Sequence, residues 1–257
     1  MTKPERRLVV LRESPWSERA KWALDHHGLS YETIHHTPFL GELRLRRLAG
    51  APKKRVTVPI LLAGDQTLIE SWDIAHYADR EGEGNKLIPR DHEADIQRWN
   101  DLADEAMSAG RALLVPVLLR NAKALDEQLP PFVPRWTRPL LRPFTRYATG
   151  WFGKKYKLHF EDAPAHLARM RTALEILRAA LEKSTPYLLG DFSYADIVMA
   201  VTLQGVSPVD DRYIPLEPAS RQAWTRSDLA TEFADLIAWR NRLYELRRVR
   251  SDRSHRA

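Results

Sequence analysis

Three short segments carry the side chains with which this chain could do chemistry: Ser14-Pro15, Val58-Pro59 and Glu70-Ser71. Ser14 stands directly before a helical pattern, where serine is a favoured N-cap and proline fits the first helical position. A helix N-terminus presents unpaired N–H groups and the positive end of the helix dipole, and both stabilise an anion. A serine hydroxyl there can donate one more hydrogen bond, for example to a bound thiolate. The alternative is that Ser14 is simply a good cap.

Pro59 interrupts the strand pattern of residues 56–62. Because proline removes a hydrogen-bond donor from the ladder, it marks an edge or a bend of the sheet. We predict that the Val58–Pro59 bond is cis. A cis bond would turn the backbone N–H and C=O of Val58 outward, where they could pair with an extended peptide.

Glu70-Ser71 stands at a strand end and a helix start, 11 residues after Pro59. A serine hydroxyl and the helix N–H groups can hold a carboxylate, while the Glu70 carboxylate can accept hydrogen bonds from an ammonium group. Together they fit the head group of an α-amino acid. Helix capping is the alternative explanation here too.

Composition excludes several kinds of site. The chain contains no cysteine, so disulfides, thiolate metal sites and an enzyme thiol are excluded, and any sulfur chemistry must use a sulfur of the ligand. The nine histidines form no HExxH-like spacing, and no metal site is expected. No glycine-rich phosphate loop is present.

The patterns change from mixed to purely helical along the chain. Residues 8–35 suggest a β-α-β unit, 36–55 an irregular basic stretch, and 56–69 a hairpin that turns at Gly64-Asp65 and leads to a helix. Helical periodicity then dominates, with expected helices at 92–119, 164–182, from Ser193 onward and at 229–249. The change predicts a first domain of residues 1–88 and a helical domain of residues 89–257.

Quoted segments of both halves resemble one family. The order SPWSERAKWALDHHGLSYE, VTVPILL and LIESWDIAHYADR resembles the N-terminal domain of glutathione S-transferases, nearest to serine-type classes such as tau and zeta, with the layout of omega. PYLLGDFSYADIVMAVTL is similar to the family's helical-domain motif, in which Ser193 and Asp196 form a capping box. Residues 8–88 and 160–206 carry the resemblance, whereas 120–160 and 207–257 match poorly. It implies an α/β thioredoxin-like domain followed by an all-α domain.

The resemblance implies roles for individual residues. Ser14 corresponds to the residue that faces the glutathione thiol, and Val58, before the cis-proline Pro59, to the one that pairs with the cysteinyl backbone. Glu70 and Ser71 correspond to the γ-glutamyl binders.

Other assignments are more open. The glycine carboxylate of glutathione usually meets a basic residue, for which Lys53, Lys54 and Arg55 all qualify and Lys54 is favoured. The omega-like layout usually has cysteine where Ser14 stands, and serine cannot form a mixed disulfide. Ser17 is a second candidate hydroxyl, ranked below Ser14.

The expected function is therefore a glutathione S-transferase that conjugates bound glutathione thiolate, its co-substrate, to a small electrophile without a metal. The hydrophobic substrate site is expected near Trp16, Met107 and Arg111. The sequence does not distinguish between aryl halides, epoxides, unsaturated carbonyls, peroxides and maleyl compounds as the second substrate. Family relatives also suggest a homodimer and a role in detoxification.

The net charge of +6 is concentrated in residues 135–157 and 240–256. We interpret these stretches as a solvated helix face and a frayed tail, and the aromatic residues of 136–160 as helix core and a wall for the electrophile. Neither nucleic acid nor a membrane is an expected partner. No signal peptide opens the chain, so a cytoplasmic location is expected. The alternative function is a non-catalytic interaction or ligand-carrier protein that uses the basic, aromatic helical domain.

Overall fold

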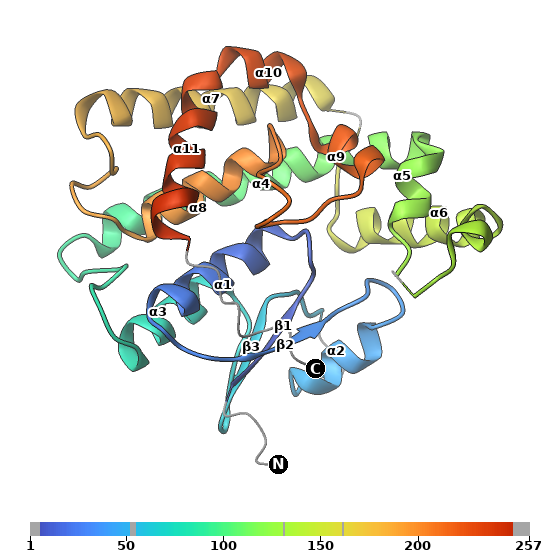
Figure 1. The fold of residues 1–257 in the computed structure, drawn as a ribbon, viewed down its shortest axis with the longest axis horizontal. Helices are drawn as coiled ribbons and strands as arrows, with labels where there is room; N and C mark the ends of the chain where they lie inside the picture. The colour runs from blue at the N-terminus through green and yellow to red at the C-terminus, as the bar shows by residue number, and fades with distance from the viewer. Residues whose placement is uncertain (1–5, 52–54, 131, 161, 249–257) are drawn as a thin grey trace. The chain divides into compact units, whose positions relative to one another are not determined.

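The computed structural model describes residues 6–51, 55–130, 132–160 and 162–248 (Figure 1). The chain divides into two compact units. The first comprises the described residues of 1–101, 180–201 and 238–257, and the second those of 102–179 and 202–237. The sheet lies wholly before residue 88, where the sequence predicts the change to helices. The domain boundary at that residue remains a prediction.

A four-stranded sheet organises the first unit, with the order β2-β1-β3-β4. Its strands are β1 (Arg6–Val10), β2 (Glu32–His35), β3 (Ile60–Ala63) and β4 (Gln66–Leu68). The helix α1 (Pro15–His26) connects the parallel pair β1 and β2, and β3 pairs antiparallel with both β1 and β4. The β-α-β unit and the hairpin are thus confirmed. Gly64 turns the hairpin with a φ of +59°, which glycine adopts without strain.

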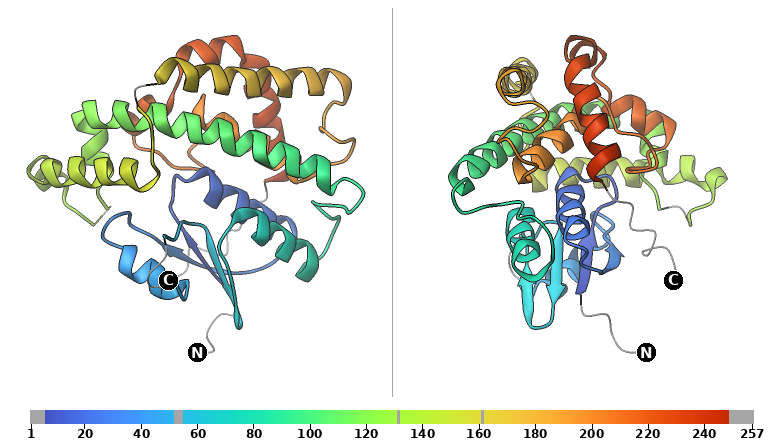
Figure 2. Two further views of the ribbon diagram at one scale, coloured as in Figure 1. Left: turned by 180° about the vertical axis from the view of Figure 1, so that it is seen from behind. Right: turned by 60° about the vertical axis from the view of Figure 1, so that its left-hand side comes forward.

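Helices cover both faces of this sheet. The helices α1 and α3 (Ser71–Glu81) pack side by side (Figure 2). Val9 and Ile60 form a core cluster with Leu45 of α2 (Glu42–Leu48). Because side chains alternate along a strand, the fully buried Leu8 and Val10 point to the opposite face from Val9. The expectation of an irregular stretch at 36–55 is therefore wrong at α2, whose leucines bind it to the sheet.

The rest of the described chain is helical. Its α-helices are α4 (Glu93–Arg120), α5 (Ala122–Glu127), α6 (Arg138–Lys155), α7 (Ala163–Lys183), α8 (Tyr194–Thr202), α9 (Pro218–Trp224), α10 (Ser227–Glu232) and α11 (Ala234–Arg247). A 3₁₀ turn at Arg135–Thr137 precedes α6. None of the helices that the structure describes is long and apolar enough to cross a membrane.

The expected single helix at 229–249 is two helices, α10 and α11, that break at Phe233. The Phe233 side chain is fully buried, and the Arg178 guanidinium lies 4.5 Å from its ring centroid. Arg178 also donates to the Glu232 carbonyl at 2.6 Å and to the Asp235 carboxylate at 2.6 and 2.8 Å. These bonds satisfy backbone and side-chain acceptors on both sides of the break, which explains why the chain leaves helical geometry there.

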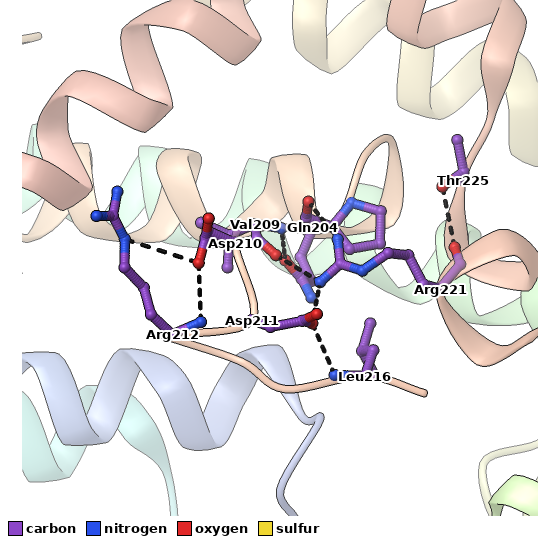
Figure 3. A network of polar contacts seen from close by, with 9 residues as sticks. Gln204, Val209, Asp210, Asp211, Arg212, Leu216, Arg221 and Thr225 are labelled. Atoms are coloured by element: carbon purple, nitrogen blue, oxygen red, sulfur yellow. Dashed lines mark hydrogen bonds and ion pairs between the residues drawn. The ribbon is translucent and has the colours of Figure 1, made fainter. Parts of the chain in front are cut away.

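A polar network holds the long connection between α8 and α9 (Figure 3). Arg221 donates to the carbonyls of Pro208 and Val209, at 3.1 and 2.9 Å, and pairs with Asp211. Asp211 in turn accepts from the Leu216 N–H at 3.0 Å. The connection therefore has a defined path, although after the short 3₁₀ helix Leu203–Gly205 it contains no further helix or strand.

Candidate functional site

Strand register brings the three predicted segments to one end of the sheet. Val9 pairs with Ile60, so Pro59 follows level with Val10, and the turn to Ser14 begins at the same end. Leu61 pairs with Leu68, so the chain leaves β4 toward Glu70 at this end too. Both α1 and α3 begin here. Two helix N-termini and the Val58–Pro59 bond thus share one edge, which suits a ligand with two anionic groups.

Ser14 is the N-cap of α1, and Pro15 is the first helical residue, as the sequence predicts. The Ser14 hydroxyl oxygen accepts a hydrogen bond from the Ser17 N–H at 3.4 Å, which is long for such a bond. Capping uses the oxygen as an acceptor, and a hydroxyl can donate its proton at the same time. The capping role is therefore confirmed, and it leaves room for a bond to a ligand.

Ser17 has a different environment. Its side chain is fully buried, and its hydroxyl accepts from the Leu11 N–H at 3.2 Å. This bond ties the end of β1 to the first turn of α1. The geometry favours Ser14 over Ser17 as the hydroxyl that a ligand could reach.

The Val58–Pro59 peptide bond is cis, as predicted. The Val58 side chain packs against the core cluster around Leu45, between the sheet and α2. Within the described residues, neither the N–H nor the C=O of Val58 forms a backbone hydrogen bond. This backbone edge is therefore suited to pairing with an extended peptide.

Glu70 occupies the N-cap position of α3 but makes no capping hydrogen bond with its side chain. The Glu70 side chain is exposed, while Ser71 behind it is 4% exposed. The capping explanation therefore fails for Glu70. An exposed carboxylate beside a serine and the first N–H groups of an 11-residue helix can bind an ammonium and a carboxylate together.

The structure leaves the predicted glycine-carboxylate ligand open. Lys53 and Lys54 lie outside the described residues. Arg55 is described and exposed, three positions before Val58. In the parts of the chain that the structure describes, no group of three histidine, cysteine, aspartate or glutamate side chains could hold a metal ion.

The three residues predicted for the hydrophobic substrate site belong to two units. Trp16 lies in α1 in the first unit, whereas Met107 and Arg111 lie on α4 in the second. Met107 is 6% exposed, and the Arg111 guanidinium lies 4.1 Å from the Tyr156 ring centroid. Their joint role in binding an electrophile remains a prediction.

Sequence reasoning missed a buried charge cluster beneath α1. Arg248, in the stretch interpreted as a frayed tail, donates to the Glu18 carboxylate at 2.7 Å and pairs with Asp25. Glu18 is 2% exposed. Burial raises the pKa of Asp25, while the Arg248 charge acts in the opposite direction. The tail interpretation is therefore wrong for Arg248, and no local pattern could reveal a partner 230 residues away.

Comparison with family models gives two matches. Residues 13–81 match the model for the N-terminal domain of glutathione S-transferases, and residues 110–242 match the model for their C-terminal domain. The second match includes residues 120–160 and much of 207–257, where the quoted motifs matched poorly. Both matches therefore extend the resemblance along most of the chain.

Curated relatives match over shorter stretches. A probable glutathione S-transferase of Solanum tuberosum is 33% identical over 87 residues, which are 34% of this chain and 39% of that protein. One of Nicotiana tabacum is 30% identical over 107 residues, 41% of this chain and 47% of that protein. The matched stretch thus spans less than half of each relative.

Solved structures match over nearly the whole chain. A glutathione S-transferase of Methylobacillus flagellatus with bound glutathione has a TM-score of 0.59 at 17% identity, over 94% of this chain and 95% of that one. Glutaredoxin 2 of Salmonella typhimurium in complex with glutathione has a TM-score of 0.52 at 19% identity, over 90% and 96%. At these identities the likeness is one of fold.

Proposed function

Because the chain belongs to the glutathione S-transferase family, we propose that it is a transferase that binds glutathione at the sheet end described above and conjugates its thiolate to a small electrophile. The observation that carries this proposal is the meeting of three features at one edge: the α1 N-terminus with Ser14, the cis Val58–Pro59 bond, and the α3 N-terminus with Glu70-Ser71. The glutathione-bound relatives of similar fold support it.

Each feature has a distinct task in binding. The Ser71 hydroxyl and the α3 N–H groups hold the γ-glutamyl carboxylate, and the Glu70 carboxylate accepts from the ammonium group. The Val58 N–H and C=O pair with the cysteinyl backbone. A basic residue of the segment 53–55, with Lys54 favoured, meets the glycine carboxylate. These contacts direct the thiol toward Ser14.

Ser14 and the α1 N-terminus then stabilise the thiolate. A hydrogen bond to a charged group contributes about 1.5–3 kcal/mol, and the helix dipole about 0.3–1 kcal/mol. Since one pKa unit corresponds to about 1.4 kcal/mol, these effects lower the pKa of a thiol from about 8.5 to roughly neutral values. The thiolate sulfur attacks an electrophilic carbon and forms the new S–C bond, while that carbon loses its bond to a leaving group such as halide, its epoxide C–O bond or its C=C π bond, and the electron pair of the broken bond stays on the departing or distal atom. The chain therefore needs no thiol of its own.

The proposal extends to the second substrate and the assembly. We assign the electrophile to a site that uses Trp16, Met107 and Arg111, with its chemical class left open as above. A cytoplasmic homodimer that acts in detoxification is the form that the family suggests.

Calorimetry with glutathione tests the proposal. Glu70→Ala should weaken binding at least about tenfold, because the ammonium group of glutathione loses its carboxylate partner. Asp65→Ala is the matched control, since Asp65 is an exposed acid in the β3–β4 turn at the other end of the sheet. An unchanged affinity in Glu70→Ala would contradict the assignment.

A non-catalytic interaction or carrier protein is the second candidate. The exposed apolar side chains before and along α6 favour it, because contiguous exposed apolar residues mark an interaction surface and the proposed conjugation makes no use of them. Tight glutathione binding without turnover of any tested electrophile would support this candidate over the transferase.

A further inference from the structure

A series of exposed large apolar side chains begins at Phe132, before the 3₁₀ turn, and continues along that turn and α6. We call it the α6 stripe: Phe132, Trp136, Leu140, Phe144 and Tyr147, which are 84%, 78%, 75%, 39% and 63% exposed. Leu140, Phe144 and Tyr147 follow at spacings of four and three residues, so they share one face of the helix. Contiguous exposed apolar side chains of this size mark an interaction surface.

The other face of α6 is already occupied. Thr145 is 4% exposed, and Arg142 donates to both oxygens of Asp126 on α5, at 2.9 and 2.7 Å. Farther along, Gly153 is buried and Phe160 lies close to it. The helix is therefore fixed by its polar and small residues, and it presents its apolar side outward. Helix α6 packs against α5, and α5 against α9 (Figure 1).

The stripe is set in a strongly basic segment. Residues 132–157 contain seven basic residues and no acidic one: Arg135, Arg138, Arg142, Arg146, Lys154, Lys155 and Lys157. Two carboxylates of neighbouring elements approach them, Asp126 beside Arg142 and Glu217 at 3.8 Å from Arg135. Positive charge therefore remains in excess around the stripe.

We propose that the α6 stripe docks this protein on an anionic lipid surface, with its aromatic and leucine side chains inserted at the level of the headgroups. Tryptophan, tyrosine and phenylalanine are favoured at that depth, and flanking arginines and lysines pair with anionic headgroups. This departs from the sequence-based expectation, which gave these aromatic residues to the helix core and the electrophile wall. The stripe contains none of the residues assigned to glutathione.

The charge around the α6 stripe distinguishes a lipid surface from a second copy of the chain as its partner. In a symmetric dimer the same patch meets itself, so a second copy would bring seven basic residues against seven more. Nucleic acid would match the charge, but Leu140 has no aromatic face on which a base could stack. An anionic bilayer satisfies both the apolar stripe and its basic surroundings.

Vesicle flotation tests the proposal, with phosphatidylcholine vesicles and vesicles that also contain phosphatidylglycerol. The protein should float with the mixed vesicles, bind pure phosphatidylcholine far more weakly, and dissociate as salt is raised. Trp136→Ser with Leu140→Ser should weaken binding at least about tenfold, because two inserted apolar side chains are lost. Arg146→Gln and Lys154→Gln should each cost about fivefold.

Leu246→Ser is the matched control, because Leu246 is 74% exposed on α11 outside the stripe, and it should bind vesicles normally. All the substituted positions are exposed, so thermal unfolding and glutathione affinity should stay unchanged in every variant. Equal vesicle binding by the wild type and the Trp136→Ser, Leu140→Ser variant would overturn the proposal. So would a dimer that this variant converts to monomers in light scattering, since a second copy would then cover the stripe.

Discussion

At the scale of single residues, Ser14 combines a structural bond with a proposed chemical one. If it only caps α1, Ser14→Ala should cost about 0.5–2 kcal/mol of stability and leave turnover of the folded protein nearly normal. If it also holds the thiolate, turnover at neutral pH should fall about ten- to hundredfold with little change in glutathione affinity. Raising the pH should then partly restore the rate, because the bound thiol ionises without the hydroxyl. The pH–rate profile measures this.

Two variants control the Ser14 experiment. Ser14→Thr retains a hydroxyl, so its pH–rate profile should stay close to that of the wild type. Ser17→Ala removes a buried hydroxyl that accepts from the Leu11 N–H, so it should lower stability without moving the profile. If the pH–rate profile shifts in Ser17→Ala and is unchanged in Ser14→Ala, Ser17 and not Ser14 is the residue that stabilises the thiolate.

At the scale of elements, Asp196 fixes the start of α8. It accepts from the N–H and hydroxyl of Ser193, at 2.9 and 3.1 Å, and from the Leu188 N–H at 2.9 Å. This confirms the predicted bond from the acid back to Ser193. Burial raises the pKa of Asp196 from 3.8 to about 6, although these three hydrogen bonds act in the opposite direction.

The raised pKa of Asp196 predicts a pH-dependent stability. Between the unfolded pKa of 3.8 and the folded value of about 6, the folded state binds the proton more strongly, so stability falls as pH rises through this window. Asp196→Asn cannot titrate, so its stability deficit relative to the wild type should shrink by about 2 kcal/mol from pH 4 to pH 7. Denaturant unfolding at both pH values measures it. A constant difference would show that Asp196 is ionised throughout the window.

How far the elements could be predicted depends on their length and their signals. The long helices and the hairpin carried clear periodicity, caps or turn residues, and their types are confirmed. The short helix α2 was missed because seven residues with three arginines show too little periodicity, and packing of Leu45 and Leu48 in the core cluster beside the sheet stabilises it. Each of the three site segments, at Ser14, Pro59 and Glu70, could be recognised in the sequence. Their meeting at one end of the sheet depends on the strand register, which only the structure shows. The exposure of Trp136 and Leu140 depends on what α6 packs against, which no local pattern states.

At the scale of the whole chain, Arg248 joins the end of the described polypeptide to its first helix. It pairs with Glu18 and Asp25, both on α1, and Trp22 between them donates to the Arg247 carbonyl at 3.2 Å. Removing one partner of a buried charge cluster leaves the others uncompensated, which typically costs about 3–5 kcal/mol. Arg248→Met should therefore lower the free energy of unfolding by about that amount in denaturant titration.

The pH dependence and a double variant distinguish lost charge pairing from lost packing. Burial already raises the pKa of Asp25, and without Arg248 it should rise further. A carboxyl with a raised folded pKa loses stability as pH rises through that pKa, so the deficit of Arg248→Met should be smaller at about pH 4 than at about pH 7. Adding Glu18→Gln should recover part of the deficit at neutral pH, because one buried charge is then removed. A deficit that is independent of pH and unaffected by Glu18→Gln would mean that Arg248 stabilises α1 by packing alone.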